Sequence, residues 1–460
     1  MNSAAPPVPD SHHPLDRFLR LFADVRSGEG GQLLLLAANV FLILTAYYLM
    51  KPVREALILA QPGGAEIKSY SMAAQAVLLV FLIPAYGALA GRLSRRHLIN
   101  TVTALFIACL PPFYLAAEAG LPVGIPFFLW IGVFSLMVIA QFWAYANDSY
   151  TPEAGKRLFA LIAFGASSGA VFGAFASARL IEVVGVHGLL LAAAAVLAAS
   201  LALFNLIDLR AQASPARATQ REPGAEVGAA VGTDSAFGLV LRSRYLLLIA
   251  ALILLLNWVN ATGEYILSSI VSRAAQDEVT AGRLEAERVR AYIGSFYASY
   301  FQVVNIAGMV LQLFLVSRIV KFIGVRGAVC VLPLVALGSY AAAMLLPTLA
   351  VMRWVKTAEN SVDYSLQNTV SQMLYLPTSR EEKYKAKQVT DTFVVRAGDV
   401  LSSATVFVGT AVLALGVAHF AMINVALVLA WFVVAVLVGR EFHRRTFAPA
   451  QATAPAGARA

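Results

Sequence analysis

Charged residues are scarce in this sequence. Asp, Glu, Lys and Arg make up only 13% of its 460 residues, whereas 59% are hydrophobic. Soluble domains contain about 25% charged residues on average. This scarcity excludes an ordinary soluble domain and predicts an all-α polytopic membrane protein, whose surroundings are the lipid bilayer.

Cysteine is nearly absent as well. Cys109 and Cys330 are the two cysteines in the chain, and both lie inside apolar runs. They supply neither a disulfide framework nor the spacing of a metal site. We therefore expect both to be packing residues, and we predict no metal site and no cofactor.

Several signals of other protein classes are missing. Residues 1–26 have no apolar core, so no cleavable signal peptide is expected. No Gly-x-x-x-x-Gly-Lys-Ser/Thr loop occurs, so ATP hydrolysis is not expected to power the protein. None of the six histidines lies beside a Cys or Ser in a nucleophile motif. An enzyme is therefore not expected.

Long apolar runs, in contrast, fill the sequence. A bilayer core needs about 20 helical residues per span, and windows of this length predict about twelve transmembrane helices. An Ala-, Pro- and Gly-rich stretch near the middle predicts a flexible linker between two six-helix halves. The predicted organisation is an N-terminal segment (1–30), a first half (31–208), a linker (209–243), a second half (244–438) and a tail (439–460).

The net charge of +9 follows the predicted topology. Most of the 35 Lys and Arg residues fall in alternate loops, for example 92–96 and 380–387, or near the termini. By the positive-inside rule, these loops and both termini are cytoplasmic. The basic excess therefore reports membrane orientation, and no nucleic-acid partner is expected.

Two further patterns predict structure rather than chemistry. Gly165, Gly169 and Gly173 recur every four residues, which places them on one helix face and lets another helix approach closely. Residues 273–290 are charged and helix-prone, and they predict an external surface helix.

Charges inside the first span mark the first candidate for a substrate site. Lys51, Arg54 and Glu55 interrupt an apolar run that starts near Leu33, and Pro52 lies among them. A charge near the bilayer centre costs at least a few kcal/mol, so such residues normally face a partner or a watery cavity. An internal ion pair between Lys51 and Glu55, one turn apart, is the structural alternative.

Polar residues also interrupt the fourth and seventh spans. Asn147 and Asp148 end the fourth, where they line a site or cap the helix. Asn260 and Glu264 share a helical face of the seventh with Asn257, so a cavity or interhelical hydrogen bonds would both explain them.

The tenth span carries the clearest polar stripe. Lys356, Asn360 and Asp363 recur at spacings of three and four, and Arg396 follows in the eleventh span. A lipid-facing helix cannot carry such a stripe, whereas a water-filled cavity can. Charges that latch helices together are the alternative. Cations and acids in the spans nearly balance, which permits an anion, a zwitterion or a proton-coupled substrate.

Four motifs occur in order along both halves: Tyr47-Tyr-Leu-Met-Lys51-Pro-Val-Arg54-Glu55, Phe142-Trp-Ala-Tyr-Ala-Asn147-Asp148 with Lys156-Arg157, Tyr364-Ser-Leu with Met373-Leu-Tyr-Leu-Pro377, and Lys385-Ala-Lys387 with Asp391 and Arg396-Ala-Gly398. Together they resemble motifs of the bacterial and plastid-type ATP:ADP antiporters, or nucleotide translocases, of the major facilitator superfamily. The segment Gly87–His97 also resembles in part the signature that the superfamily has in the loop between its second and third spans. Gly91 stands where that signature has an acidic residue.

The resemblance implies a site, with some departures. Arg54 occupies the position of the lysine that the family has in its first span. Asp148 occupies the position of the acidic residue in its fourth span. Asn260 stands at the seventh-span glutamate, with Glu264 one turn later as a substitute. Ser371-Gln372 replaces the tenth-span Lys-Glu, which removes a cation expected to meet phosphate.

We therefore predict an alternating-access secondary transporter with a site between its halves. The substrate is a small anion, and nucleotide exchange of the ATP:ADP type is the first hypothesis. Transport of another organic anion or phospho-compound, and a non-transporting membrane scaffold, are the alternatives. The expected location is the bacterial inner membrane. The predicted substrate-binding residues are Lys51, Arg54, Glu55, Asn147, Asp148, Asn260, Glu264, Lys356, Asn360, Asp363 and Arg396.

Overall fold

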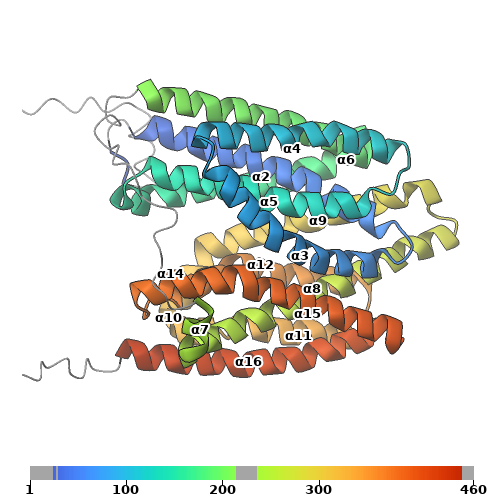
Figure 1. The fold of residues 1–460 in the computed structure, drawn as a ribbon. Coiled ribbons are helices and arrows are strands. Elements are labelled where there is room, and N and C mark those ends of the chain that lie inside the picture. The colour runs from blue at the N-terminus through green and yellow to red at the C-terminus, as the bar shows by residue number, and fades with distance from the viewer. Residues whose placement is uncertain (1–23, 27–28, 214–235, 448–460) are drawn as a thin grey trace, which may run out of the picture. The chain divides into compact units, whose positions relative to one another are not determined.

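The computed structural model describes residues 24–26, 29–213 and 236–447, and within these ranges it contains helices and no strand (Figure 1). The first half of the chain forms five long helices. They are α2 (Gly30–Leu59), α3 (Gly64–Ala90), α4 (Arg95–Glu118), α5 (Gly124–Ser149) and α6 (Pro152–Ala213).

The second half is more broken, because four π-helical turns interrupt its helices. Its elements are α7 (Ala236–Arg242), α8 (Arg244–Thr280), η2 (Ala286–Arg288), α9 (Val289–Val310), η3 (Leu311–Leu315), α10 (Val316–Ala328), α11 (Val331–Leu345), α12 (Leu349–Val362), η4 (Asp363–Gln367), α13 (Asn368–Met373), α14 (Arg380–Val389), η5 (Thr390–Val394), α15 (Val395–Phe407), η6 (Val408–Val412) and α16 (Val417–Phe447). Single π-helical turns inside α-helices occur often at functional sites.

The helices are long and apolar enough to cross a membrane many times. Nine segments of the described chain qualify by length and composition. One of them, Arg157–Ala211, contains a break at Gly185, where φ is 72°, and is long enough to cross twice. Adding Val331–Leu345 and the charged segment 349–373 gives twelve crossings. The predicted all-α polytopic fold is confirmed.

One local prediction is wrong. Residues 273–290 do not form a separate surface helix, because α8 runs on to Thr280 and α9 begins at Val289. The chain turns between them at Gly282, where φ is +70° and a glycine is favoured. Charged residues can extend a membrane helix beyond the bilayer edge, so a polar run need not mark a new element.

The outer predicted segments are described only in part. Residues 209–213 continue α6, 236–242 form α7, and 439–447 continue α16. The remainder of the predicted linker, tail and N-terminal segment (1–23, 27–28, 214–235 and 448–460) lies outside the described residues.

The chain forms two compact units. Unit 1 takes the described residues of 1–62, 77–225 and 278–305, and unit 2 takes those of 63–76, 226–277 and 306–460. Two stretches therefore pack away from their neighbours in sequence. The start of α3 belongs to unit 2, and most of α9 belongs to unit 1.

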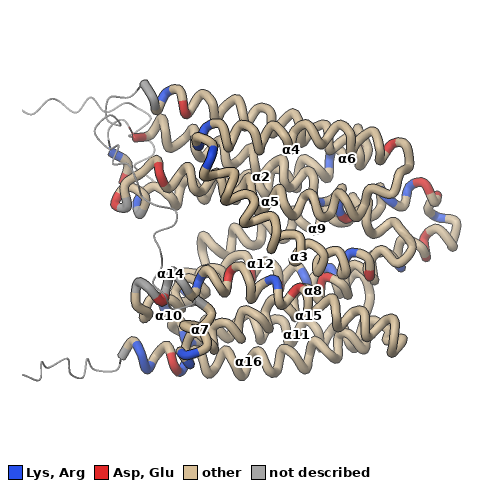
Figure 2. The backbone as a smooth tube through the Cα atoms, in the orientation of Figure 1, with Lys and Arg blue, Asp and Glu red and all other residues tan. Residues whose placement is uncertain are grey.

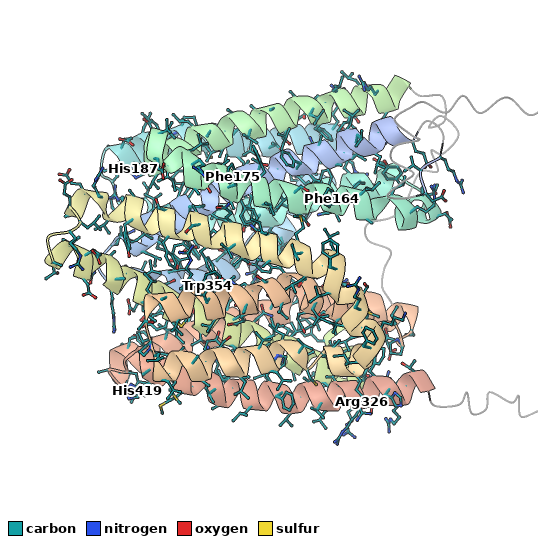
Figure 3. All side chains as sticks on the ribbon, turned by 180° about the vertical axis from the view of Figure 1, so that it is seen from behind. Phe164, Phe175, His187, Arg326, Trp354 and His419 are labelled. Carbon is teal, nitrogen blue, oxygen red and sulfur yellow. The ribbon has the colours of Figure 1, made fainter. Side chains whose placement is uncertain are left out.

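Large apolar side chains cover the outside of the helices. Phe164 and Phe175 on α6 are 49% and 42% exposed, and Trp354 on α12 is 62% exposed (Figure 3). Lys356, two residues after Trp354, is fully buried. The opposite orientation of these neighbours shows that α12 turns its apolar face outward and its charged face inward, as expected of a helix that lies in lipid.

The glycine face of α6 packs against α2 in unit 1. A Cβ atom at Gly165 would lie 2.6 Å from the carbonyl oxygen of Ala37, and one at Gly173 would lie 2.6 Å from that of Thr45. At Gly169 it would overlap the carbonyl oxygen of Phe41. Thr45 Oγ1 also donates a hydrogen bond to the Gly169 carbonyl at 3.3 Å. Close backbone contact thus joins the two helices.

This contact predicts a sharp difference between two glycines. Gly169→Ala should lower the free energy of unfolding by about 1–3 kcal/mol, because the added methyl group meets backbone. Gly87→Ala on α3 should be neutral or stabilising by about 0.5–1 kcal/mol, because nothing lies within 4 Å of its Cβ position. Thermal unfolding in detergent measures both, and equal effects of the two variants would contradict the close contact.

Candidate functional site

A fully buried lysine stands at the centre of the polar groups in unit 2. Lys356 on α12 has 0% side-chain exposure. Its Nζ donates a hydrogen bond to Asn260 Oδ1 at 2.9 Å and lies 3.3 Å from Glu359 Oε1 and 3.7 Å from Glu264 Oε1. Since an uncompensated buried charge costs several kcal/mol, these three oxygens stabilise the ammonium. Figure 2 marks the acidic and basic positions along the backbone.

Glu264 on α8 joins Lys356 to a second lysine. Its Oε1 accepts a hydrogen bond from Asn360 Nδ2 at 3.3 Å, and its Oε2 lies 3.7 Å from Lys68 Nζ. Lys68, on α3, is 4% exposed and also donates to Ser268 Oγ at 2.9 Å. One carboxylate therefore lies between two buried ammonium groups from different helices.

Glu359 extends the network to α11. Its Oε1 accepts a hydrogen bond from the Tyr340 hydroxyl at 3.0 Å, and its side chain is 4% exposed. Tyr340 is fully buried, and its hydroxyl also lies 3.4 Å from the backbone oxygen of Val259. We call this network the unit 2 charge cluster; it comprises Lys68, Asn260, Glu264, Tyr340, Lys356, Glu359 and Asn360.

Helix geometry explains why these residues meet. Asn260 and Glu264 are one turn apart on α8, and Lys356 and Asn360 are one turn apart on α12, so each pair shares a face. Gly263 lies between the two α8 residues. A Cβ atom there would overlap the Tyr340 hydroxyl and lie 3.1 Å from Lys356 Nζ, so the close approach of both side chains requires glycine.

The sequence did not predict Lys68 or Tyr340 as members of the site. Hydropathy does not fix where the second span begins, and Lys68 lies just before its apolar run. The helix begins at Gly64, directly after the turn-forming pair Pro62-Gly63, and this signal would have moved Lys68 inside. A single tyrosine in an apolar span gives no comparable signal.

A second cluster lies in unit 1 on α2. Lys51 Nζ lies 4.2 Å from the ring centroid of Phe301 and 4.8 Å from that of Tyr48. Arg54 Nε donates to Glu55 Oε1 at 2.9 Å, and its guanidinium lies 5.0 Å from the ring centroid of Phe128. Cations over ring faces are stabilised electrostatically when desolvated. The unit 1 charge cluster is Lys51, Arg54 and Glu55 with these rings.

Asn147 and Asp148 lie elsewhere in unit 1. Both are exposed at the end of α5, where Asp148 forms an ion pair with Arg95 of α4. Phe128, which contacts Arg54, precedes Asp148 by twenty residues on the same helix, or about 30 Å at 1.5 Å per residue. The structure therefore does not bring Asn147 and Asp148 to the unit 1 charge cluster.

Asp363 and Arg396 complete the predicted set. Asp363 opens the π-helical turn η4 and interacts electrostatically with Lys356 and Glu359. Arg396 Nη1 lies 2.9 Å from Asp399 Oδ2 on α15, at a spacing of three. Asp363 thus adds a carboxylate to the charges around Lys356, whereas Arg396 pairs with its neighbour on its own helix.

Two further basic residues bear on the family motifs. Arg157 Nη2 donates to Glu29 Oε1 at 3.0 Å, which fastens the start of α6 to the residue before α2. Burial alone raises the pKa of Glu29, but the hydrogen bond and charge of Arg157 outweigh it and hold the pKa below its ordinary value. Lys387 donates a hydrogen bond to Gln372 Oε1. A cation therefore lies beside the position where the motif's lysine is replaced.

The clusters suit an anion better than a metal ion. In the ranges that the structure describes, no group of three or more His, Cys, Asp or Glu side chains could hold a metal. Each cluster instead offers a cation that is paired with a carboxylate oxygen, Lys356 with Glu359 and Arg54 with Glu55. A phosphate or carboxylate group of a substrate could replace such an oxygen through charge-assisted hydrogen bonds.

Comparisons with known proteins agree with the fold. A model of the TLC ATP/ADP transporter family matches residues 9–117 and 128–442. No curated protein matches the sequence significantly.

Solved transporter structures share the architecture at low identity. The nucleoside transporter NupG is 12% identical with a TM-score of 0.59 and covers 90% of this chain and 99% of its own. A bacterial homologue of the iron transporter ferroportin, inward-facing, is 13% identical with a TM-score of 0.58 and covers 88% and 98%. A bacterial homologue of the lysosomal transporter Spinster is 15% identical with a TM-score of 0.57 and covers 91% and 98%. At these identities the likeness establishes the fold alone.

The unit 2 charge cluster predicts strong coupling between Lys356 and Glu359. Lys356→Met should lower the free energy of unfolding by about 3–5 kcal/mol, because it leaves buried carboxylates without their cation. Adding Glu359→Gln should recover part of this loss, since one of those carboxylates is then neutral. A double-mutant cycle by thermal unfolding measures the coupling. Strictly additive effects would show that the two side chains do not interact.

Proposed function

The chain belongs to the TLC ATP/ADP transporter family, and from this membership and its buried cations we propose that it exchanges nucleotides, ATP against ADP, by alternating access. It is a multi-pass secondary membrane transporter with a small-molecule substrate, and it is not an enzyme. The family match extends over both halves of the chain, which agrees with the motif resemblance drawn from the sequence.

The single observation that carries the proposal is the position of Lys356. Its ammonium is fully buried in a membrane helix, and side-chain oxygens of Asn260, Glu264 and Glu359 on α8 and α12 lie 2.9–3.7 Å from it. A charge in this position is costly and normally functional. Lysine binds phosphate as a compact point charge. A nucleotide phosphate that replaced Glu264 or Glu359 would keep the ammonium compensated.

Arg54 supplies the second proposed phosphate contact. Its guanidinium is 18% exposed and is held by Glu55 and by the ring of Phe128. A guanidinium can bind a phosphate through two parallel hydrogen bonds. We propose that Lys51, Asn260, Asn360 and Arg396 add polar contacts to the substrate.

The proposed acids have a complementary role. Glu55, Glu264 and Asp363 would neutralise the cations when no nucleotide is bound. Asn147 and Asp148 would contact the substrate separately, at the end of α5. We further propose a bacterial inner membrane location, with both termini cytoplasmic and the halves at 31–208 and 244–438.

Exchange follows if the empty site is hard to close. Arg54 and Arg396 retain 18% and 31% side-chain exposure while each is paired with a carboxylate. A conformational change that buried either guanidinium further without adding a partner would be unfavourable. A bound nucleotide removes this cost, so the loaded protein would reorient more readily than the empty one.

Counterflow in proteoliposomes tests the proposal. Uptake of labelled ATP should require ADP inside the vesicles. Arg54→Ala should reduce uptake about tenfold or more, because a hydrogen bond to a charged group contributes about 1.5–3 kcal/mol. Arg283→Ala is the matched control, because Arg283 is 64% exposed and pairs with Glu278 outside both clusters. ATP uptake that ignores internal ADP would contradict exchange.

Transport of another organic phosphate is the second candidate, and the sequence Ser371-Gln372 favours it because the motif's tenth-span lysine is absent. The hydrogen bond from Lys387 to Gln372 partly offsets this departure. Thermal shifts across a panel of phosphorylated metabolites should separate the two, since a ligand stabilises according to its affinity. The largest shift with ATP or ADP is the expected result, and a larger shift with a phosphorylated compound that is not a nucleotide would favour the second candidate.

A further inference from the structure

Glu359 is the most confined carboxylate of the unit 2 charge cluster. It is 3% exposed, on the buried face of α12. Its Oε1 is fully engaged by the Tyr340 hydroxyl at 3.0 Å and by Lys356 Nζ at 3.3 Å. Its Oε2 is buried and has no hydrogen-bond partner within the described chain. A buried carboxylate oxygen without a donor is costly, and a proton on Oε2 would remove the charge that makes it so.

The charges that face Glu359 do not balance. Two cations lie in the cluster, Lys356 on α12 and Lys68 on α3. Three carboxylates share them: Glu359, Glu264 on α8 and Asp363 of η4, which interacts with both Glu359 and Lys356. Tyr340 on α11 is the remaining titratable group against Glu359. With every acid ionised, the unit 2 charge cluster and Asp363 together carry one surplus negative charge.

A nucleotide would add to this surplus. If a phosphate binds Lys356, as the proposed function requires, Glu359 loses the ammonium that contacts it at 3.3 Å. Two like charges that share a buried site disfavour ionisation of one of them. The geometry therefore links the arrival of an anion at Lys356 to the uptake of a proton at Glu359.

We infer that Glu359 Oε2 is a proton-binding site and that the protein carries a proton together with the more highly charged nucleotide. The proton adds to one carboxylate oxygen, no other bond changes, and the site gains one positive charge. A nucleoside triphosphate is more negative than a diphosphate at neutral pH. The proton therefore enters with ATP and leaves when ADP takes its place. The site stands on the geometry of Glu359, whereas its coupling to nucleotide rests on the proposed function.

Lumenal pH during exchange tests the coupling. Proteoliposomes loaded with ADP and a pH-sensitive dye should become acidic inside when ATP is added outside. The same vesicles loaded with ATP should show no net change, because each proton that enters is matched by one that leaves. Glu359→Gln should abolish the acidification per labelled nucleotide exchanged, even where its exchange is slower. Glu66→Gln is the matched control, since Glu66 also accepts a hydrogen bond from a tyrosine, Tyr265, at 3.0 Å.

The outcomes separate the two proposals. Exchange without acidification in the unmodified protein, or acidification that persists in Glu359→Gln, would overturn the proton coupling and leave nucleotide exchange intact. Absence of any nucleotide exchange in the unmodified protein would overturn the proposed function instead.

Infrared spectroscopy decides the proton site without any substrate. In lipid, the unmodified protein should show a protonated carboxyl band whose intensity changes with pH, and Glu359→Gln should lose it. Tyr340→Phe keeps the carboxyl group but removes the hydrogen bond to Oε1, so its band should titrate at higher pH. The Tyr340→Phe variant still tests the proton site if Glu359→Gln fails to fold. An identical band in all three proteins would overturn the site.

Discussion

A charge buried in a membrane protein must be compensated by other groups of the protein, and this constraint organises the structure. Lys356 is fully buried, and its compensation takes oxygens from α8 and α12. Those oxygens are in turn held by Lys68 of α3 and Tyr340 of α11. Four helices of unit 2 are therefore joined by one set of charges, and Gly263 is needed to let them approach. The same constraint explains why Arg54 lies against Glu55 and an aromatic ring in unit 1.

Compensation by carboxylates has a functional consequence, because an anion can take the place of a carboxylate. The cations of a binding site for a phosphate must be stable when the site is empty and available when substrate arrives. Glu264 and Glu359 stabilise Lys356 when no substrate is bound. Their carboxylate oxygens lie 3.7 and 3.3 Å from its ammonium, so a phosphate oxygen can replace either of them. The displaced carboxylate then has to be neutralised, and a proton is the simplest way. Phosphate binding and proton uptake thus arise from one arrangement.

The sequence predicted the parts that follow from periodicity. The stripe of the tenth span identified Lys356 and Asn360, because helical spacing places them on one face. The glycines every four residues predicted the close approach of another helix, and the structure shows that this helix is α2. Lys68 was missed because hydropathy does not fix where a helix begins. Tyr340 was missed because it is a single polar residue in an apolar run. Asp148 could not be separated from the clusters by sequence, since its position depends on how far along α5 it lies from Arg54.

The central claim is that Lys356 exchanges a carboxylate partner for a phosphate when substrate binds. Solid-state NMR in lipid can measure this directly, through dipolar coupling between the ¹⁵N-labelled lysine ammonium and the ³¹P nuclei of bound ATP. The Lys356 signal, assigned by its loss in Lys356→Arg, should be dephased by phosphorus in the ATP complex and by ¹³C-labelled glutamate carboxylate in the empty protein. A Lys356 ammonium that keeps its carboxylate coupling and gains no phosphorus coupling with ATP bound would contradict the account.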